Sequence, residues 1–365
     1  MPGFSQSLSY LRLKCEACVV RRFANRAQRD GYTLELPTQR QLIKIPSRDT
    51  GRRVRIWVYP HLDWNRSPKR PGMINWHGSG FVVGGFGLDH VWCTEAAYDL
   101  GIWVIDADYR KAPENPFPAA VHDAEDVLGW VSTRPDLFDL DRVAVSGFAS
   151  GATLALVAAS TLRRADHGLN IRVPVVFYPI TNSDIDSARK RPPQRELSVS
   201  LSIRITRFFN KCYVPNRDDR LNPRVSPDLG DLESFPDHVV FTTAEHDVFA
   251  PEGMTLADNL RNGRRTVISF MVQGANHGFD KDRRGDDFER RRATAYSVAR
   301  DHLDNALQAV ALGFPQFPLP APPGDAERLR DLLVSGYRGP NRHRVRQWVC
   351  DSAPRPRPRP RPPAN

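Results

Sequence analysis

The sequence predicts an α/β fold built around one mostly parallel β-sheet. Short apolar runs, Met73–Trp76, Ile102–Ala107 and Arg142–Ser146, alternate with helical stretches such as Ala119–Ser132. This alternation is typical of parallel strands covered by helices on both faces. The segment Ala152–Ser160 is apolar all round and lacks Pro and Gly, which indicates a helix buried against the sheet. A chain of 365 residues is long enough for one large domain.

The other elements follow from local patterns. An apolar stripe at helical spacing predicts a helix over Leu8–Phe23, which we interpret as a lid over a pocket; a helix on a membrane surface is the alternative. Gln41–Ile45 and Arg53–Tyr59 predict two strands joined by a turn at 47–51. Three more predicted strands bring the sheet to eight: Val173–Ile180, His238–Thr243 and Thr266–Met271. Two further helices are predicted over Pro251–Asn262 and Ala293–Leu312.

Two segments depart from the strand–helix rhythm. Between Asp184 and Pro227 the chain is basic and interrupted by Pro, with a helical centre at Leu201–Phe209. We therefore expect a domain over 1–312 whose cap comes from residues 1–35 and 184–230. Residues 313–365 contain an Arg–Pro alternation and one short predicted helix, Glu327–Val334. This segment is predicted to be a disordered tail, with a polyproline II ligand for a partner domain as the alternative.

The formal net charge of +10 is concentrated in that tail. Eight Arg and one acid, Asp351, lie between Arg338 and Asn365, so the rest of the chain is near neutral. This distribution argues against a nucleic-acid-binding face. Four basic residues in the predicted cap fit either acidic substrates or a solvated face: Arg189, Lys190, Arg191 and Arg195.

Five scattered Cys argue for a reducing compartment and against a disulfide framework. Cys15 and Cys18 form a CxxC pair within the N-terminal apolar stripe, and we expect them to be small buried side chains rather than a redox or metal site. The sequence has no apparent membrane span or signal peptide, which predicts a cytoplasmic protein. It contains no metal motif and no dinucleotide fingerprint, so we expect no cofactor.

The strongest chemical motif is His77-Gly-Ser-Gly-Phe81, directly after a predicted strand. Small residues at Gly78 and Ser79 let a substrate approach the backbone N–H groups, which can stabilise an oxyanion. Taken alone, such a loop could also be a plain tight turn.

Five motifs in order resemble the hormone-sensitive-lipase family of esterases: HGSGF, DYRKAPENPFPAA, VAVSGFASG, TAEHDV and NHGF. The resemblance spans about residues 40–312. It implies an α/β-hydrolase fold, with an eight-stranded mostly parallel sheet, helices on both faces and a helical cap. It also implies a triad in the order Ser, Asp, His, with Asp247 as the acid and His277 as the base. Gly78, Ser79 and Ser150 match the positions whose N–H groups form the oxyanion hole.

The nucleophile motif of this family, GxSxG, falls on Gly147 to Gly151, and its central position is Ala149. Ser150 stands one place later and could serve instead as the catalytic nucleophile. A shifted turn would need small residues two positions before and after Ser150, where the chain has Phe148 and Ala152. The resemblance therefore implies the ancestry of an ester hydrolase with an altered nucleophile.

Several functions fit this pattern. The first is hydrolysis of a small or medium acyl ester or lactone through Ser150 or a water activated by His277, with secondary metabolism as one setting for it. A second is a catalytically retired hydrolase that binds a hydrophobic ligand, and a third is a biosynthetic cyclisation or lactone rearrangement with His277 as base. Ala149 could also be a substitution of an ordinary Ser. The resemblance further implies a homodimer formed through the last strand and helix.

Overall fold

The computed structural model describes residues 4–31, 40–59, 69–164, 168–194, 202–281 and 287–308. The chain divides into two units, 1–316 and 317–365, and every described residue belongs to the first. The predicted tail at 313–365, with its short helix and Cys350, lies outside the described residues. The same is true of 195–201 within the predicted cap.

Eight strands form one sheet in the order β1-β2-β4-β3-β5-β6-β7-β8. The strands are β1 (Gln41–Pro46), β2 (Arg53–Tyr59), β3 (Arg70–Trp76), β4 (Trp103–Ala107), β5 (Phe138–Phe148), β6 (Ile171–Phe177), β7 (His238–Ala244) and β8 (Thr266–Val272). Strand β2 pairs antiparallel with β1 and β4, and all other pairs are parallel. The predicted eight-stranded, mostly parallel sheet is confirmed.

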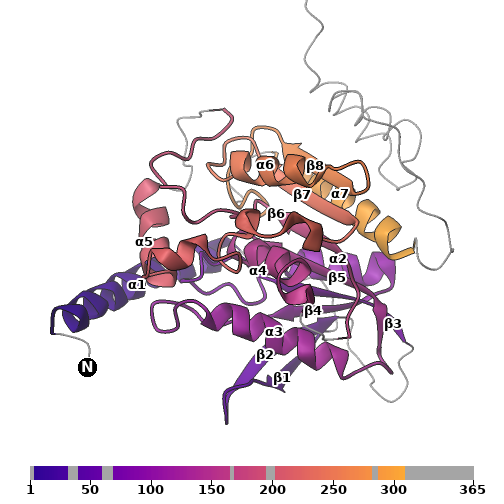
Figure 1. Ribbon diagram of the computed structural model, residues 1–365, viewed down its shortest axis with the longest axis horizontal. Helices are drawn as coiled ribbons and strands as arrows, with labels where there is room; N and C mark the ends of the chain where they lie inside the picture. Colours follow the sequence, from indigo (N-terminus) through magenta and orange to yellow (C-terminus); the bar gives the residue numbers. More distant parts are fainter. Residues whose placement is uncertain are drawn as a thin grey trace, which may run out of the picture. The chain divides into compact units, whose positions relative to one another are not determined.

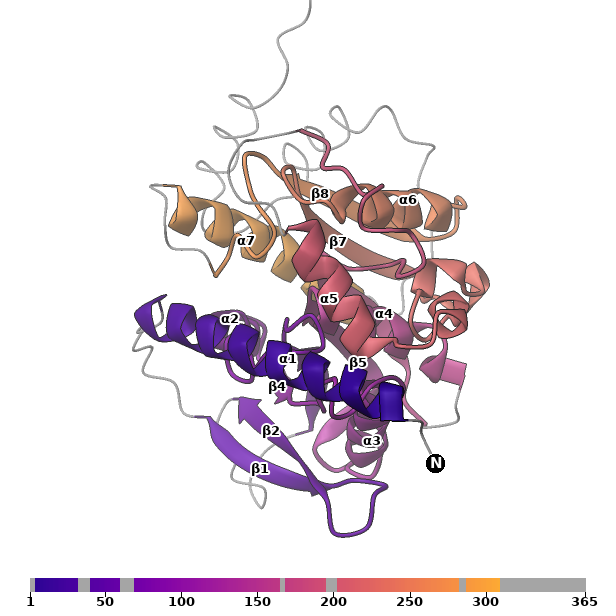
Figure 2. The same cartoon turned by 90° about the vertical axis from the view of Figure 1, so that its left-hand side faces the viewer.

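Helices cover both faces of this sheet (Figures 1 and 2). Helices α3 (Ala119–Ser132) and α4 (Ser150–Ala159) pack together on one face, while α2 (His90–Leu100) and α7 (Phe288–Gln308) pack on the other. In Figure 2 the two pairs lie to the right and left of the strands. Helix α6 (Ala250–Leu260) packs on β7 and β8. All ten residues of α4 are buried, as its uninterrupted apolar sequence predicts.

Two helices cross the end of the sheet where the parallel strands finish. Helix α1 (Phe4–Gly31) and helix α5 (Ile203–Tyr213) lie side by side in both views. The rest of the predicted cap contains short 3₁₀ turns at Asp218–Leu221 and Pro227–Leu229, and others lie outside it at Leu162–Arg164 and Leu232–Ser234. The lid role of α1 stays a prediction.

The face that α1 turns inward differs from the predicted one. Cys15 and Cys18 are exposed, so the expectation that they are buried is wrong. Ala17 is fully buried and Leu13 is partly buried, while Phe23 is 71% exposed. Leu11 and Val19 of the predicted apolar stripe are also exposed, at 56% and 53%. No helix in the described part of the chain is long and apolar enough to cross a membrane.

Strand β5 is longer than predicted and brings the chain directly to the site. It spans Phe138–Phe148, whereas the sequence predicts Arg142–Ser146, because the charged residues at its start and Gly147 near its end hide the strand pattern. Strands β3 and β6 pair with β5 on either side as far as Gly147 and Phe148. The chain therefore turns into α4 at the middle of the sheet.

Candidate active site

The loop after β3 passes close to two other parts of the chain. Gly80 has φ +55°, and a Cβ at this position would collide with the Phe209 ring of α5. A Cβ on Gly78 would crowd the Phe148 carbonyl oxygen at 3.1 Å. Glycine is therefore required at Gly80, and Gly78 keeps the backbone of this loop accessible. The loop after β3 thus packs closely against both α5 and the end of β5.

The turn from β5 into α4 is equally tight. A Cβ on Gly147 would meet the backbone of Gly151, and a Cβ on Gly151 would meet the Trp76 carbonyl group at the end of β3. Between these glycines Ala149 adopts φ +50° and ψ −114°, a conformation that L-residues rarely take. Such strain at a residue that faces a cavity is characteristic of functional turns. The side chain held in this conformation is a methyl group.

Ser150, the next residue, points away from that cavity. It is fully buried, and its Oγ accepts a hydrogen bond from the Ser79 N–H at 2.9 Å. Its Oγ also lies 3.0 Å from the Tyr109 hydroxyl and 3.3 Å from Ser79 Oγ. The structure therefore brings Ser150 to the loop after β3, at residues 77–81, where its hydroxyl belongs to a buried hydrogen-bonded cluster.

Asp247 and His277 lie together as their motifs predict. Asp247, just after β7, is fully buried, and its Oδ2 lies 2.8 Å from His277 Nδ1. Its Oδ1 accepts from the Phe249 N–H at 3.0 Å, so both carboxylate oxygens are held. A carboxylate accepts, so Nδ1 carries the imidazole proton and Nε2 is the basic nitrogen. This arrangement can accept a proton from water or from a substrate.

Aromatic rings fix the plane of the His277 imidazole. Tyr178 and Phe249 pack edge-on against it, with ring centroids 4.8 Å and 5.4 Å away. The Tyr178 hydroxyl donates to buried Asp280 Oδ1 at 2.5 Å, which anchors this ring in turn. Sequence reasoning missed Tyr178 because its role depends on packing. The predicted strand Val173–Ile180 also hid it, because β6 ends at Phe177 and Tyr178 follows at the carboxyl edge of the sheet.

A cavity of about 300 Å³ opens at this edge of the sheet. Gly78, Ser79, Ala149 and His277 all line it, whereas Ser150 is not among its lining residues. Most of the remaining wall is apolar and comes from the cap and from loops that follow strands: Val20, Ala24, Phe81, Val83, Leu88, Phe148, Tyr178, Ile180, Phe209, Tyr213 and Phe249. The cavity can therefore hold a small, largely apolar molecule with a polar group near His277.

Two lysines also line the cavity, and each is paired with a buried carboxylate. Lys190 Nζ lies 2.5 Å from Glu252 Oε2, and burial raises the pKa of Glu252 to about 7 although the Lys190 charge acts in the opposite direction. Lys281 Nζ lies 3.0 Å from Asp89 Oδ1, whose pKa is also raised by burial. Each ammonium group therefore has a buried carboxyl group as its internal partner. Lys190 is thus neither a solvated face nor a free anion site, the two alternatives left open by the sequence.

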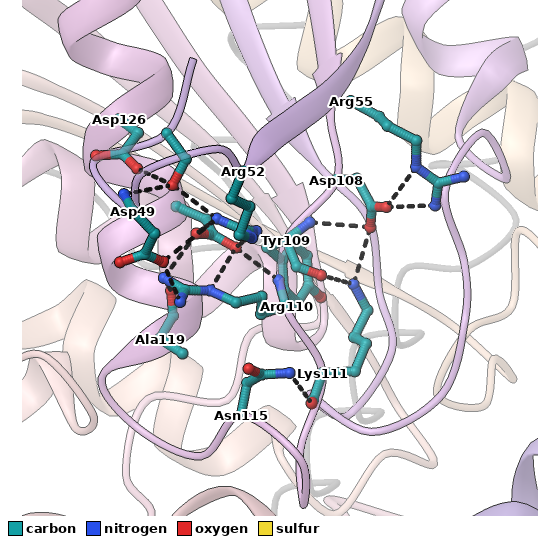
Figure 3. Close-up of polar contacts among 12 residues, drawn as sticks. Asp49, Arg52, Arg55, Asp108, Tyr109, Arg110, Lys111, Asn115, Ala119 and Asp126 are labelled. Carbon is teal, nitrogen blue, oxygen red and sulfur yellow. Dashed lines mark hydrogen bonds and ion pairs between the residues drawn. The ribbon is translucent and has the colours of Figure 1, made fainter. Parts of the chain in front are cut away.

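The segment after β4 contacts His77, at the start of the loop that follows β3. The His77 ring stacks on Tyr109, and His77 Nε2 lies 3.3 Å from Asp108 Oδ1. Burial opposes ionisation of Asp108, but the His77 hydrogen bond and the Lys111 charge outweigh it and lower its pKa. Figure 3 shows Arg55 and Lys111 converging on this carboxylate. These contacts give the DYRKAPE motif a structural role behind the site.

Nothing in the described residues suggests a bound metal. No cluster of three or more His, Cys, Asp or Glu side chains that could hold an ion occurs among them.

Comparisons with known proteins agree with this architecture. A family model described as alpha/beta hydrolase fold matches residues 73–281. The chain is 32% identical over 206 residues to ethyl acetate hydrolase from Pseudomonas putida, covering 56% of this chain and 64% of that protein. It is 37% identical over 213 residues to esterase LipI from Mycobacterium tuberculosis, covering 57% and 65%. The chain thus matches just under two thirds of the length of these relatives.

Two solved structures extend the similarity. One is a thermophilic carboxylesterase cloned from a metagenomic library, with 26% identity, a TM-score of 0.65 and coverage of 79% of this chain and 97% of that chain. The other is a hyperthermophilic esterase from Pyrobaculum calidifontis, with 26% identity, a TM-score of 0.62 and coverage of 82% and 94%. Fold, motif order and family match agree: the chain belongs to the α/β-hydrolase fold family.

Proposed function

We propose that the protein hydrolyses a small or medium acyl ester or lactone, with His277 as a general base that activates water. The named relatives are ester hydrolases, which supports the reaction class. The observation that carries the proposal is the 2.8 Å contact between His277 Nδ1 and Asp247 Oδ2 beside a cavity that His277, Ala149 and Gly78 all line. A base oriented by a carboxylate contributes about 10²–10⁴-fold to such a proton transfer.

In this proposal Ala149 stands where an ester hydrolase of this fold carries its nucleophilic Ser. Its strained backbone and the two flanking glycines support the assignment. A methyl group cannot form an acyl-enzyme bond, so water must attack the substrate carbonyl directly. The oxyanion that forms would accept hydrogen bonds from N–H groups of the loop after β3 and of the first turn of α4.

Ser150 is the alternative nucleophile, and its contacts argue against it. Its Oγ is fully buried and bonded to the Ser79 N–H, and the Tyr109 hydroxyl lies 3.0 Å away. To attack a substrate, the hydroxyl would have to leave this cluster and reach the cavity that Ala149 lines. Leaving the buried Ser79 N–H without its acceptor in this way costs about 1–3 kcal/mol.

Hydrolysis of p-nitrophenyl butyrate, followed together with labelling by a fluorophosphonate probe, tests the proposal. We expect slow turnover that His277→Ala abolishes, no label on the wild-type protein, and labelling of Ala149→Ser. A labelled peptide containing Ser150 from the wild-type protein would overturn the water mechanism. Turnover that survives His277→Ala would overturn the role of the base.

A second function, ligand binding without turnover, is favoured by one observation. Because the Ser79 N–H already donates to Ser150 Oγ, one of the predicted oxyanion donors has an internal partner. If butyl butyrate binds by titration calorimetry and is recovered unchanged from the wild-type protein, binding is the better description. Cyclisation or lactone rearrangement would instead require an isomeric product, which mass spectrometry combined with chromatography detects.

A further inference from the structure

We propose that the Ser150 hydroxyl occupies one hydrogen-bond donor of the oxyanion hole, the Ser79 N–H. Two residues, Ala149 and Ser150, then together lower the reactivity of the site. This inference rests on the proposed function, because it concerns how the same site stabilises an oxyanion. Ser150 is a positioning residue here, acting through the Ser79 N–H. Ala149 leaves the site without a nucleophile, and Ser150 in addition leaves it without one free oxyanion donor.

The first support is the geometry of the donor. Ser79 lines the cavity, yet its single N–H hydrogen is directed at Ser150 Oγ, 2.9 Å away. A substrate carbonyl oxygen would have to displace this oxygen, and Ser150 Oγ, fully buried, would gain no water in exchange. The N–H therefore contributes little to an oxyanion as long as the hydroxyl stays in place.

The second support is that the Ser150 hydroxyl also contacts the Tyr109 hydroxyl. The Tyr109 hydroxyl donates its only hydrogen to the His77 carbonyl oxygen at 2.6 Å. Burial raises the pKa of Tyr109 above its ordinary value, so this hydrogen is retained. Ser150 and Ser79 must then donate their own hydrogens to Tyr109 or to each other. Ser150 Oγ thus keeps a lone pair directed at the Ser79 N–H.

The consequence is a specific requirement for restoring a serine esterase. Ala149→Ser supplies the attacking oxygen but leaves the donor occupied. Ala149→Ser with Ser150→Ala supplies the oxygen and releases the Ser79 N–H. Removing one oxyanion donor from a serine hydrolase lowers kcat by about 10²–10³-fold, so releasing one should raise it by a substantial part of that factor.

The test compares these two variants in full-length protein. We expect the double variant to exceed Ala149→Ser about tenfold or more in kcat for p-nitrophenyl butyrate and in fluorophosphonate labelling rate, with KM changing little. Ala149→Ser/Ser150→Thr keeps an oxygen at this position and should stay at the level of Ala149→Ser. Ala149→Ser/Thr153→Ala is the matched control, because Thr153 is a buried hydroxyl of the same helix that donates to the Ile180 carbonyl oxygen.

Equal kcat and labelling rate in the double variant and in Ala149→Ser would overturn the inference. So would the same gain from Thr153→Ala, since general loosening of α4 would then explain it. Thermal unfolding shows that each variant is folded before it is compared. The readout is a ratio within the Ala149→Ser background, so it stays valid even if the wild-type protein shows no turnover and the proposed function fails.

Discussion

His277 Nδ1 lies 2.8 Å from Oδ2 of Asp247, and thirty residues of sequence separate the two. Strands β7 and β8 run parallel as neighbours, so the residues that follow them meet at one edge of the sheet. The pair faces a cavity whose other wall carries a methyl group, that of Ala149, at the strained turn. The site combines an oriented base with a position that lacks an attacking oxygen.

Asp247→Asn should reduce hydrolysis of p-nitrophenyl butyrate by about 10²–10⁴-fold, because an amide no longer stabilises the imidazolium that forms during proton transfer. Initial rates at saturating substrate measure the effect. Asp258→Asn is the matched control, since Asp258 is an exposed acid on α6 that pairs with Arg261. Equal rates for Asp247→Asn and the wild-type protein would remove the acid from the mechanism.

Phe209→Ala should shift the substrate preference toward longer acyl chains. The Phe209 ring lines the cavity and fills the space beside Gly80, so its removal lengthens the room for a substrate. We expect the rate on p-nitrophenyl octanoate relative to acetate to rise about tenfold or more. Phe208→Ala serves as control, because its ring packs against the core without lining the cavity. An equal shift in both variants would show that the cavity is not the cause.

Gly151→Ala should destabilise the protein by about 1–3 kcal/mol or more, because the added Cβ would run into the Trp76 carbonyl group. Gly129→Ala, in α3, meets nothing within 4 Å and should stabilise by about 0.5–1 kcal/mol. Urea unfolding followed by circular dichroism compares the two. If the free energy of unfolding changes in the same direction in both variants, close packing of β3 against α4 is not what requires Gly151.

The Glu252–Lys190 pair should make stability depend on pH. Burial raises the pKa of folded Glu252 from 4.5 to about 7, so between these values the folded state holds a proton that the unfolded state has lost. Stability from this group is complete below pH 4.5 and falls as pH rises toward 7, by up to about 1.4 kcal/mol per pH unit. The double variant Lys190→Met/Glu252→Gln should lack this decline. Urea unfolding midpoints at pH 5 and pH 7.5 measure this loss of stability. An equal decline in the wild-type protein and the double variant would refute the role of Glu252.

Much of the architecture was predictable from local patterns. The strand–helix alternation predicted the eight-stranded sheet, and an all-apolar segment predicted buried α4. The motif match placed Gly147 and Gly151 at the turn after the central strand, where the structure leaves no room for a Cβ on either. The contact between Asp247 and His277 was predictable because each residue follows a strand within a recognisable motif.

Other features could not be read from the sequence. The inward face of α1 was assigned wrongly, since the apolar stripe with Cys15 and Cys18 turns outward. The Lys190–Glu252 pair joins residues 62 positions apart, and no local pattern connects them. Whether a lysine faces solvent or a carboxylate is decided by how the cap folds against the domain.

The sequence by itself determined the sheet, the family and the presence of alanine at the turn, because periodicity, glycine spacing and motif order are local properties of the chain. Only the tertiary structure decided what Ser150 does. The direction of one hydroxyl depends on the Ser79 N–H and the Tyr109 hydroxyl, which reach it from 71 and 41 residues away. A hydrogen bond requires its partners within about 3 Å, and folding alone brings them that close.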